Sequence, residues 1–224
     1  MSRARVVLLS KADRWSNDAA VMARAAFPAL EHHSGTRFDP FPEIGGGPID
    51  VLLSFLSPWI VPEPLLRRSA LAINFHPASA AYPGIGCYNF ALYEGAAEYG
   101  AVAHHMAPRV DTGSLIAERR FPVFAGDSVE TLKLRTLVVM TALYAEIVGM
   151  LAAGKPLPEC AAVWERRPFT RRELDALATV DPGMPPEEIA RRVRATTYPG
   201  FPGTEVELGG VRFSAPVPSR APYA

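Results

Sequence analysis

The sequence predicts an α/β fold: a Rossmann-like, mostly parallel sheet with helices on both faces, plus a small C-terminal helix and β-hairpin subdomain. Short apolar runs of strand length alternate with segments of helical character, which is typical of a parallel-rich sheet. The runs 5–9 and 49–56 are dominated by apolar residues, which are consecutive over 6–9 and 51–53, as expected of strands buried on both faces. Further on, the chain changes to short helices and a Gly-Gly turn. We therefore expect a main domain over residues 1–156 and the subdomain over residues 157–224.

The strands and helices of the main domain follow from its apolar runs and from its Gly and Pro residues. The predicted strands cover residues 5–9, 49–56, 71–75, 100–106 and 115–123. The predicted helices cover residues 18–30, 63–68, 88–95 and 127–153. The polar residues 31–35 are expected to end the first helix. Asp127 and Glu130 have the spacing of a capping box, with Asp127 as the N-cap of the last helix.

The subdomain carries its own helix and turn signals. Thr170 and Glu173 form a second capping-box pattern, which predicts a helix over 171–178. A further helix is predicted over 187–194. A Gly-Gly pair between two alternating apolar runs predicts a hairpin over 206–213.

Composition limits the classes of partner. The 23 Lys and Arg residues balance the 23 Asp and Glu residues, so we expect no nucleic acid partner, which would favour a basic excess. The longest apolar stretch, 137–153, is interrupted by Glu146, and we interpret it as a buried helix and expect no membrane association. The run 6–9 is too short for a signal peptide. The two cysteines lie far apart in the sequence, which excludes a disulfide scaffold and fits a cytoplasmic location.

Polar side chains gather at one predicted strand end and in one later loop. Asn74 lies in the strand 71–75, and His76 follows it before a proline, so we expect a turn that exposes His76. Asp111 lies in a loop that follows a later strand. Ligands of open α/β sheets bind beyond the carboxyl ends of strands, where these residues would meet. An amide and a protonated imidazole suit the oxyanion of an acyl transfer, and a carboxylate suits the proton of an attacking amine. A strand-end turn with satisfied hydrogen bonds explains the same residues, so the residues alone leave both interpretations open.

The order of several motifs resembles the folate-dependent formyltransferase family. The matching segments are a strand and loop that line the pterin pocket of the family, its Asn-x-His-Pro motif, its late strand and its aspartate loop: residues 50–60, 73–77, 100–106 and 109–116. The resemblance implies that residues 1–156 form a formyltransferase catalytic domain. It also implies that Asn74, His76 and Asp111 are the catalytic residues.

The same resemblance implies N10-formyltetrahydrofolate as a co-substrate and no metal. The pterin is expected against apolar walls and backbone groups of five residues: Leu56, Ser57, Trp59, Ile60 and Val110. Core or loop packing is an equally good explanation for Trp59. Nothing in the sequence has convincing metal-ligand spacing.

The acceptor is expected to contact Tyr82, Gly84 and His104. The second histidine of the family falls on His104, while strand alternation places His105 on the opposite side. Tyr82 is interpreted either as stacking on the acceptor or as a buried anchor of its loop. The loop 78–86 is one residue shorter than the family pattern and lacks its arginine, so further acceptor contacts do not carry over.

Sugar N-formyltransferases, which formylate nucleotide-linked amino sugars, resemble this chain in their compact core and short tail. The segments 192–195 and 198–203 are similar to segments of that tail. The resemblance implies a small-molecule amine acceptor on a nucleotide-linked sugar, and a homodimer.

Four further functions stay open. A glycinamide ribonucleotide formyltransferase is possible, although the glycine-rich loop of that group has no counterpart at 10–15. A methionyl-tRNA formyltransferase is also possible, although that group has a longer, basic tail. The third is a non-catalytic folate- or nucleotide-binding module, and the fourth is a formyl-folate hydrolase.

Overall fold

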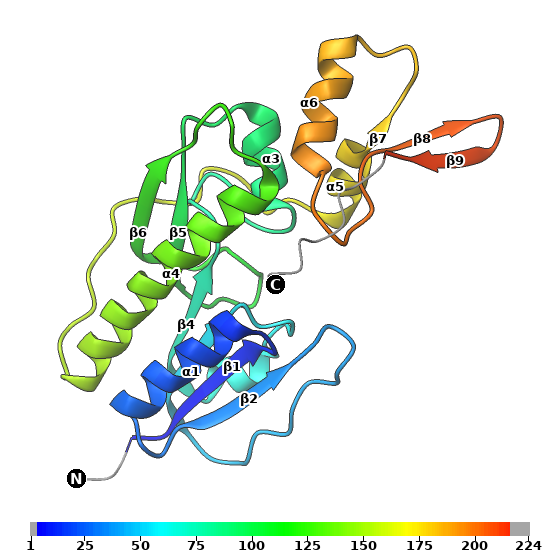
Figure 1. The fold of residues 1–224 in the computed structure, drawn as a ribbon. Helices are drawn as coiled ribbons and strands as arrows, with labels where there is room; N and C mark the ends of the chain where they lie inside the picture. The colour runs from blue at the N-terminus through cyan, green and yellow to red at the C-terminus, as the bar shows by residue number, and fades with distance from the viewer. Residues whose placement is uncertain (1–3, 216–224) are drawn as a thin grey trace.

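The computed structural model describes residues 4–215, which contain a six-stranded sheet and a three-stranded sheet (Figure 1). The large sheet has the strand order β2-β1-β3-β4-β5-β6. Its strands are β1 (Val6–Lys11), β2 (Glu31–Gly35), β3 (Ile49–Phe55), β4 (Ser69–His76), β5 (Glu98–His105) and β6 (Leu115–Pro122). The first four strands of this order pair in parallel, whereas β5 is antiparallel to β4 and to β6. Five of the six strands therefore run in one direction, which confirms the prediction of a mostly parallel sheet.

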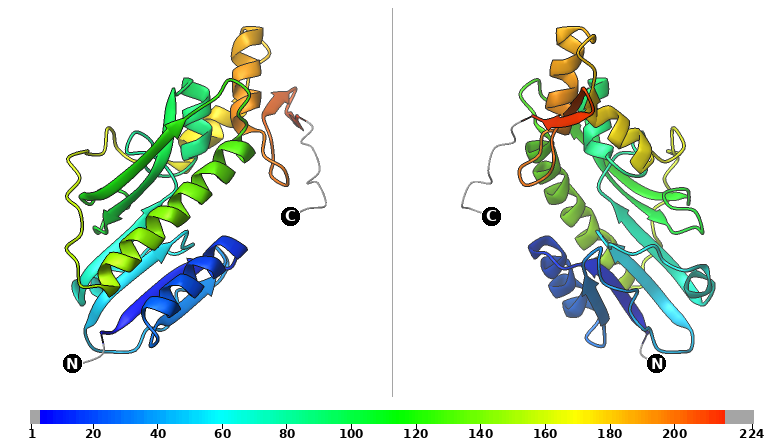
Figure 2. Two further views of the ribbon diagram at one scale, coloured as in Figure 1. Left: turned by 60° about the vertical axis from the view of Figure 1, so that its left-hand side comes forward. Right: turned by 90° about the vertical axis from the view of Figure 1, so that its right-hand side faces the viewer.

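Helices cover both faces of the large sheet. They are α1 (Arg14–Ala26), α2 (Glu63–Arg67), α3 (Cys87–Glu94) and α4 (Val129–Ala152). On one face α1 and α4 lie side by side (Figures 1 and 2) and share a core cluster with Val6 and Leu8 of β1. On the other face Leu65 of α2 packs with Val7 and Leu9. Successive residues of β1 thus point to opposite cores, as its uninterrupted apolar run predicts.

The long helix α4 is a core helix. Its apolar residues are numerous enough for it to cross a membrane by length and composition alone, but one face, which includes Met140 and Tyr144, is buried in the core cluster against the sheet. The predicted capping box is wrong by one residue. Ser128 is the N-cap and Thr131 closes the box, because Asp127 instead accepts from the backbone N of Phe124 and pairs with the guanidinium of Arg135.

The start of α1 and the identity of the next element, β2, differ from the prediction. α1 begins at Arg14 rather than at residue 18, because the side chain of Asp13 accepts a hydrogen bond from the backbone N of Ser16 and caps the helix. The polar residues 31–35 do not end a helix but form β2, which pairs in parallel with β1 at the edge of the sheet. An edge strand has few apolar neighbours, so its sequence carries no apolar signal.

The C-terminal region contains α5 (Arg171–Ala178), β7 (Thr179–Val180), α6 (Pro186–Thr196), β8 (Glu205–Leu208) and β9 (Val211–Ser214). Both predicted helices and the hairpin are present. Gly209 and Gly210 have positive φ angles of 58° and 79°, as a tight hairpin turn requires. The two-residue strand β7, which pairs with β8, was not predicted. Leu177 of α5 and Ala195 of α6 share a core cluster with α3 and β5, and the boundary at residues 156–157 stays a prediction.

We predict opposite effects for two substitutions of Tyr144. Its ring lies edge-on against Phe55 and Phe75, with ring centroids 5.0 Å and 4.8 Å away. Its buried hydroxyl has no hydrogen-bond partner among residues 4–215. Tyr144→Phe removes this unpaired group and should leave the free energy of unfolding unchanged or raise it by up to about 1 kcal/mol. Tyr144→Ala should lower it by about 3–5 kcal/mol. Urea unfolding of the three proteins measures both effects, and a Phe variant less stable than wild type by more than about 1 kcal/mol would contradict the assignment.

Candidate active site

The candidate site starts from two neighbouring strands whose polar side chains share one face of the sheet. Asn74 of β4 pairs in register with His104 of β5, and His76 lies two residues further along β4. The residues between them, Phe75 and Ala103, point to the opposite face, where they pack in the core cluster with α4. Asn74, His76 and His104 therefore project together from the face that α4 does not cover. The Nδ2 of Asn74 lies 3.0 Å from the Nε2 of His104.

Asp111 completes this cluster from the loop between β5 and β6. Its backbone has a φ angle of 48°, a left-handed conformation that is uncommon for a residue other than glycine. One carboxylate oxygen, Oδ2, accepts a hydrogen bond of 2.8 Å from the backbone N of Gly84 and lies 3.4 Å from the Nδ1 of His76. The other, Oδ1, lies 3.4 Å from the Nε2 of His104. The carboxylate thus lies between two imidazoles.

The remaining ring nitrogen of each histidine faces a backbone carbonyl. The Nε2 of His76 donates to the carbonyl of Tyr82 at 3.0 Å, and the Nδ1 of His104 donates to the carbonyl of His105 at 2.8 Å. Because a carbonyl only accepts, each of these nitrogens carries a proton. The opposite nitrogens, Nδ1 of His76 and Nε2 of His104, are the ones that face Asp111. Both rings are therefore held in a defined orientation by the backbone.

Burial and charge act in opposite directions on Asp111. The side chain is largely removed from solvent, with 9% of the residue exposed, and burial alone would raise its pKa. The positive charge of His76, the hydrogen bonds from His104 and the backbone N of Gly84 outweigh burial and hold the pKa of Asp111 well below its usual range. The carboxylate is consequently ionised at neutral pH and favours a protonated imidazole beside it.

His76 is buried, which corrects the expectation that the turn at Pro77 exposes it. Only 5% of His76 and 2% of His104 is accessible to solvent. The reason is that the chain after Pro77 folds back over the strand end and offers its Tyr82 carbonyl to the ring. Asn74 is half-buried and is the member of the cluster nearest to solvent. The cluster is hydrogen-bonded and buried, and it also places an amide, two imidazoles and a carboxylate around one point.

The arrangement suits acyl transfer. An amide N–H and a protonated imidazole are donors for an oxyanion that develops on a carbonyl. An ionised carboxylate within 3.4 Å of both rings stabilises positive charge that develops beside it. A carboxylate with a strongly lowered pKa is a weak base, so the main effect of Asp111 is electrostatic and a direct proton transfer to it is secondary.

Tyr82 and Gly84 contribute to the cluster through their backbones. The ring of Tyr82 is buried and packs against Tyr99 and Phe169, with centroids 5.8 Å and 6.4 Å away, which favours the buried-anchor interpretation of this residue. Gly84 has a φ angle of 89°, and a Cβ atom there would lie 2.4 Å from the carbonyl oxygen of Phe169. Only glycine fits at this position, and its N–H is the one that binds Asp111.

The segment expected to bind the pterin follows β3. Leu56 turns the chain with a φ angle of 53°, and the hydroxyl of Ser57 accepts a hydrogen bond of 3.2 Å from the backbone N of Trp59. Ile60 is exposed on this loop, and Val110 is exposed on the loop that carries Asp111. Within residues 4–215, none of these five residues makes a hydrogen bond to the polar cluster. The side chains of Ile60 and Val110 are exposed to solvent, and Val110 directly precedes Asp111 in the sequence.

The contacts of Trp59 match the packing explanation. Its Nε1 donates to the carbonyl of Asp39 at 3.0 Å, and its ring lies edge-on to Phe41. A Cβ atom on Gly35 would lie 2.4 Å from the indole, so the ring fills the space between β2 and the irregular segment that follows it. Trp59 thereby fixes the loop after β3.

Sequence reasoning missed Trp164. This residue lies in the irregular segment between α4 and α5, and its indole contacts the rings of both His76 and His104. The segment has no periodicity, and a single tryptophan among charged residues carries no signal of its partners. The contacts of Trp164 with the two histidines became visible only in the structure, where this segment lies over β5.

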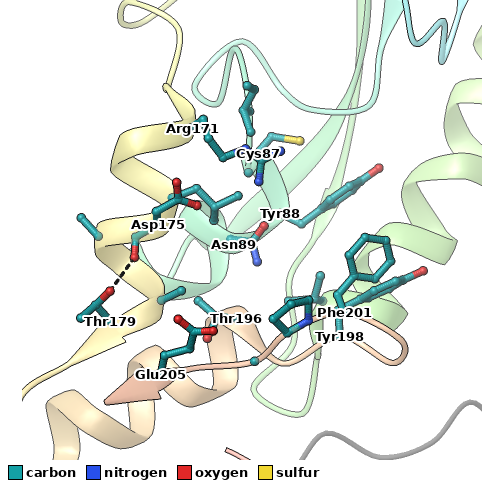
Figure 3. Close-up of a pocket in the computed structure, with 18 of the residues that line it drawn as sticks. Cys87, Tyr88, Asn89, Arg171, Asp175, Thr179, Thr196, Tyr198, Phe201 and Glu205 are labelled. Atoms are coloured by element: carbon teal, nitrogen blue, oxygen red, sulfur yellow. Dashed lines mark hydrogen bonds between the residues drawn. The ribbon is translucent and has the colours of Figure 1, made fainter. Parts of the chain in front are cut away.

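A cavity of about 900 Å³ lies between α3, α5 and the C-terminal hairpin (Figure 3). α3 contributes Cys87 and Asn89 to its wall, and the loop after α6 contributes Tyr198 and Phe201. Asn74, His76 and Asp111 do not line it. The segment 84–87 lies between the polar cluster and the cavity, because Gly84 binds Asp111 whereas Cys87 lines the cavity. Of the two regions, the polar cluster has the chemistry of an active site.

Residues 4–215 contain no group of three or more His, Cys, Asp or Glu side chains arranged to hold a metal ion.

Asp111 should make stability depend on pH. Its pKa is lower in the folded protein than the value of about 3.9 expected in the unfolded chain. The stabilisation by the carboxylate is therefore fully present above about pH 5 and is lost as the pH falls through 4 towards the folded-state pKa. We expect the difference in free energy of unfolding between wild type and Asp111→Asn to shrink over this range, as measured by denaturant titrations at several pH values. Asp18→Asn, an exposed position on α1, is the matched control. A difference that stays constant from pH 6 to pH 3 would contradict the ionised, stabilised carboxylate.

Comparison with known proteins connects the site to a family. Residues 50–148 match the family model of the formyl transferases. The chain is 26% identical to the GDP-perosamine N-formyltransferase of Brucella melitensis over 81% of its own length and 66% of that relative. The chain thus spans just under two thirds of this relative.

Solved structures share the fold. A sugar N-formyltransferase from Shewanella superposes with a TM-score of 0.78 at 14% identity, covering 97% of this chain and 98% of that one. An N-formyltransferase from Helicobacter canadensis, solved with folinic acid and dTDP-3-aminofucose, superposes with a TM-score of 0.72 at 13% identity, covering 92% and 85%. The segment 50–148, which matches the formyl transferase family model, contains Asn74, His76, His104 and Asp111.

Proposed function

We propose that this protein transfers a formyl group from N10-formyltetrahydrofolate to the primary amine of a nucleotide-linked amino sugar. One observation carries the proposal: an ionised carboxylate, Asp111, lies 3.4 Å from two imidazoles beside the amide of Asn74, inside the segment that matches the formyl transferase family. A module that only binds folate or a nucleotide has no need of this combination of groups.

The transfer follows from the roles of these groups. The acceptor amine attacks the formyl carbon, a new C–N bond forms, and the carbonyl oxygen becomes an oxyanion. The amide of Asn74 donates a hydrogen bond to this oxyanion. The nitrogens of His76 already face the carbonyl of Tyr82 and the carboxylate of Asp111, so the contribution of this ring is its positive charge rather than a hydrogen bond. The ionised carboxylate of Asp111 stabilises positive charge beside it. The bond between the formyl carbon and N10 then breaks, and the proton lost by the amine is passed through water to N10. No net proton is gained or lost by the protein.

The acceptor class and the donor rest on relatives. One relative is a GDP-perosamine N-formyltransferase, and one neighbour in fold was solved with folinic acid and dTDP-3-aminofucose. Both names describe formylation or binding of an amino sugar linked to a nucleotide. The balanced charge of the chain supports a small acceptor over tRNA, because tRNA binding favours a basic surface.

A homodimer and a cytoplasmic location are parts of the same proposal. The exposed apolar side chains of Leu208, Val211 and Phe213 on the C-terminal hairpin offer a surface for self-association. Cys87 and Cys160 are both unpaired, as is usual in a reducing compartment. Neither a nucleic acid nor a membrane is part of this proposal.

We predict that Asn74→Ala, His76→Ala and Asp111→Ala each reduce the turnover number for formyl transfer by at least about tenfold, because each removes a group that acts on the transition state. Circular dichroism should show that each variant keeps its secondary structure. His33→Gln, at an edge-strand histidine that pairs with Glu31, is the control and should retain wild-type turnover. Wild-type turnover in folded His76→Ala protein would refute the proposed chemistry.

A ligand panel tests the acceptor. We expect nucleotide-linked amino sugars to raise the melting temperature when folinic acid is present as a stable folate analogue, because a ligand that binds only the folded state stabilises it. At a ligand concentration about 100 times the Kd, the stabilisation is about 2.7 kcal/mol. Glycinamide ribonucleotide is the comparison ligand. Stabilisation by this compound alone, with none from any sugar nucleotide, would overturn the acceptor while leaving formyl transfer in place.

A further inference from the structure

We propose that Trp164 is a positioning residue of the active site, which fixes the rings of His76 and His104 against Asp111. The proposal rests on the proposed function for its kinetic consequences. The contacts between the indole and the two imidazoles do not depend on which acyl group is transferred. Trp164 lies outside residues 50–148, the segment that matches the formyl transferase family.

The indole touches both histidines. Its ring centroid lies 5.8 Å from that of His76, with the two planes at 75°, and 5.1 Å from that of His104, with the planes at 82°. These are edge-to-face contacts, a favoured geometry for aromatic pairs. A single rigid side chain therefore limits the rotation of the two rings that flank the carboxylate of Asp111.

The same indole also holds the loop that carries Asp111. The Nε1 of Trp164 donates to the carbonyl of Gly113 at 2.8 Å. Gly113 itself lies so close to β5 that a Cβ atom there would sit 1.8 Å from the carbonyl oxygen of His105. The loop is thus pressed against β5 at Gly113 and bonded to the indole two residues after Asp111.

Neighbouring residues hold Trp164 in place. The backbone N of Glu165 donates to the carbonyl of Ala80 at 3.1 Å, and that of Phe169 donates to the carbonyl of Pro83 at 2.9 Å. The indole packs in an apolar cluster with Ala80 and Val102. The segment around Trp164 therefore covers the face of β5 opposite α4, and the indole keeps water from one side of the two imidazoles.

Trp164 acts through the histidines. Its one polar hydrogen is donated to Gly113, and the indole does not titrate, so it supplies no proton and no charge to the reaction. Its effect is on the orientation and the environment of the two rings. Catalytic groups that are misplaced by a fraction of an ångström lose much of their effect on the transition state.

Two substitutions separate the contributions of the indole. Trp164→Phe keeps an aromatic ring beside the histidines but removes the hydrogen bond to Gly113. Trp164→Leu removes both. We expect kcat to fall at least tenfold in Trp164→Leu and by an intermediate factor in Trp164→Phe, with the KM for the folate and the acceptor within threefold of wild type. Trp15→Phe on α1, whose indole contacts neither histidine ring among the described residues, should keep wild-type kcat.

A spectroscopic measurement that needs no substrate tests the contact directly. Protein labelled with ¹³C at Cε1 of histidine has five resonances to follow, and the spectra of His76→Gln and His104→Gln assign two of them. We expect these two resonances to shift in both Trp164 variants, because the indole ring current and the water exclusion change. The titration midpoints of both histidines should move, and the pH profile of kcat should move with them. The resonances of His32 and His33 should stay in place.

Each outcome decides the proposal. Changed titration of His76 and His104 together with the ordered loss of kcat supports it. Unchanged titration of both histidines in folded Trp164→Phe protein overturns it, whether or not turnover is altered. A loss that appears only in KM also overturns it. If Trp164→Leu does not fold, Trp164→Phe decides alone. If wild-type protein transfers no formyl group to any acceptor, the proposed function fails, while the titrations still decide the role of Trp164.

Discussion

The candidate active site depends on one buried charge. Asp111 is ionised at neutral pH although it is almost fully removed from solvent, and an isolated carboxylate in that position would be strongly destabilising. Two imidazoles and one backbone N–H compensate for the lost water. Each of these partners is fixed by a different part of the fold: β4 holds His76, β5 holds His104, and the left-handed turn at Gly84 supplies the N–H. The polar cluster therefore forms only when several segments of the chain are correctly placed relative to one another.

Glycine and aromatic residues allow these segments to take up their positions. Gly84 lets the chain pass against Phe169, and Gly113 lets the aspartate loop approach β5 closely. Tyr82 anchors the first of these loops by its ring while its carbonyl binds His76. The polar groups of the cluster are thus presented by two loops and two strands whose positions are set by packing behind them. A preorganised arrangement of this kind is what electrostatic stabilisation of a transition state requires.

Most of the fold could be predicted from the sequence, because buried strands and capped helices carry local signals. The helix over 171–178 begins where its capping box indicates, and the run 49–56 is a strand to within one residue. β2 was missed because an edge strand of polar residues looks like a loop. The N-cap of α4 was misplaced because Asp127, Ser128 and Thr131 offer two overlapping capping patterns. In the site, Asn74, His76 and Asp111 followed from motif order, whereas the burial of His76 and the contacts of Trp164 depend on chain reversals that no short-range pattern encodes.

The antiparallel direction of β5 has a consequence for how this protein tolerates change. Because β5 and β6 are adjacent antiparallel strands with a register shift at Ala103 and His104, the chain between them is the connection of a hairpin. The position of Asp111 therefore depends on the number of residues that separate it from His104 along that connection. An added or deleted residue there would turn the carboxylate away from both rings or reverse the faces of a strand. The loop 78–86 is fixed in a similar way, because the backbones of Tyr82 and Gly84 bind His76 and Asp111. A change of length in either loop would therefore disturb the polar cluster.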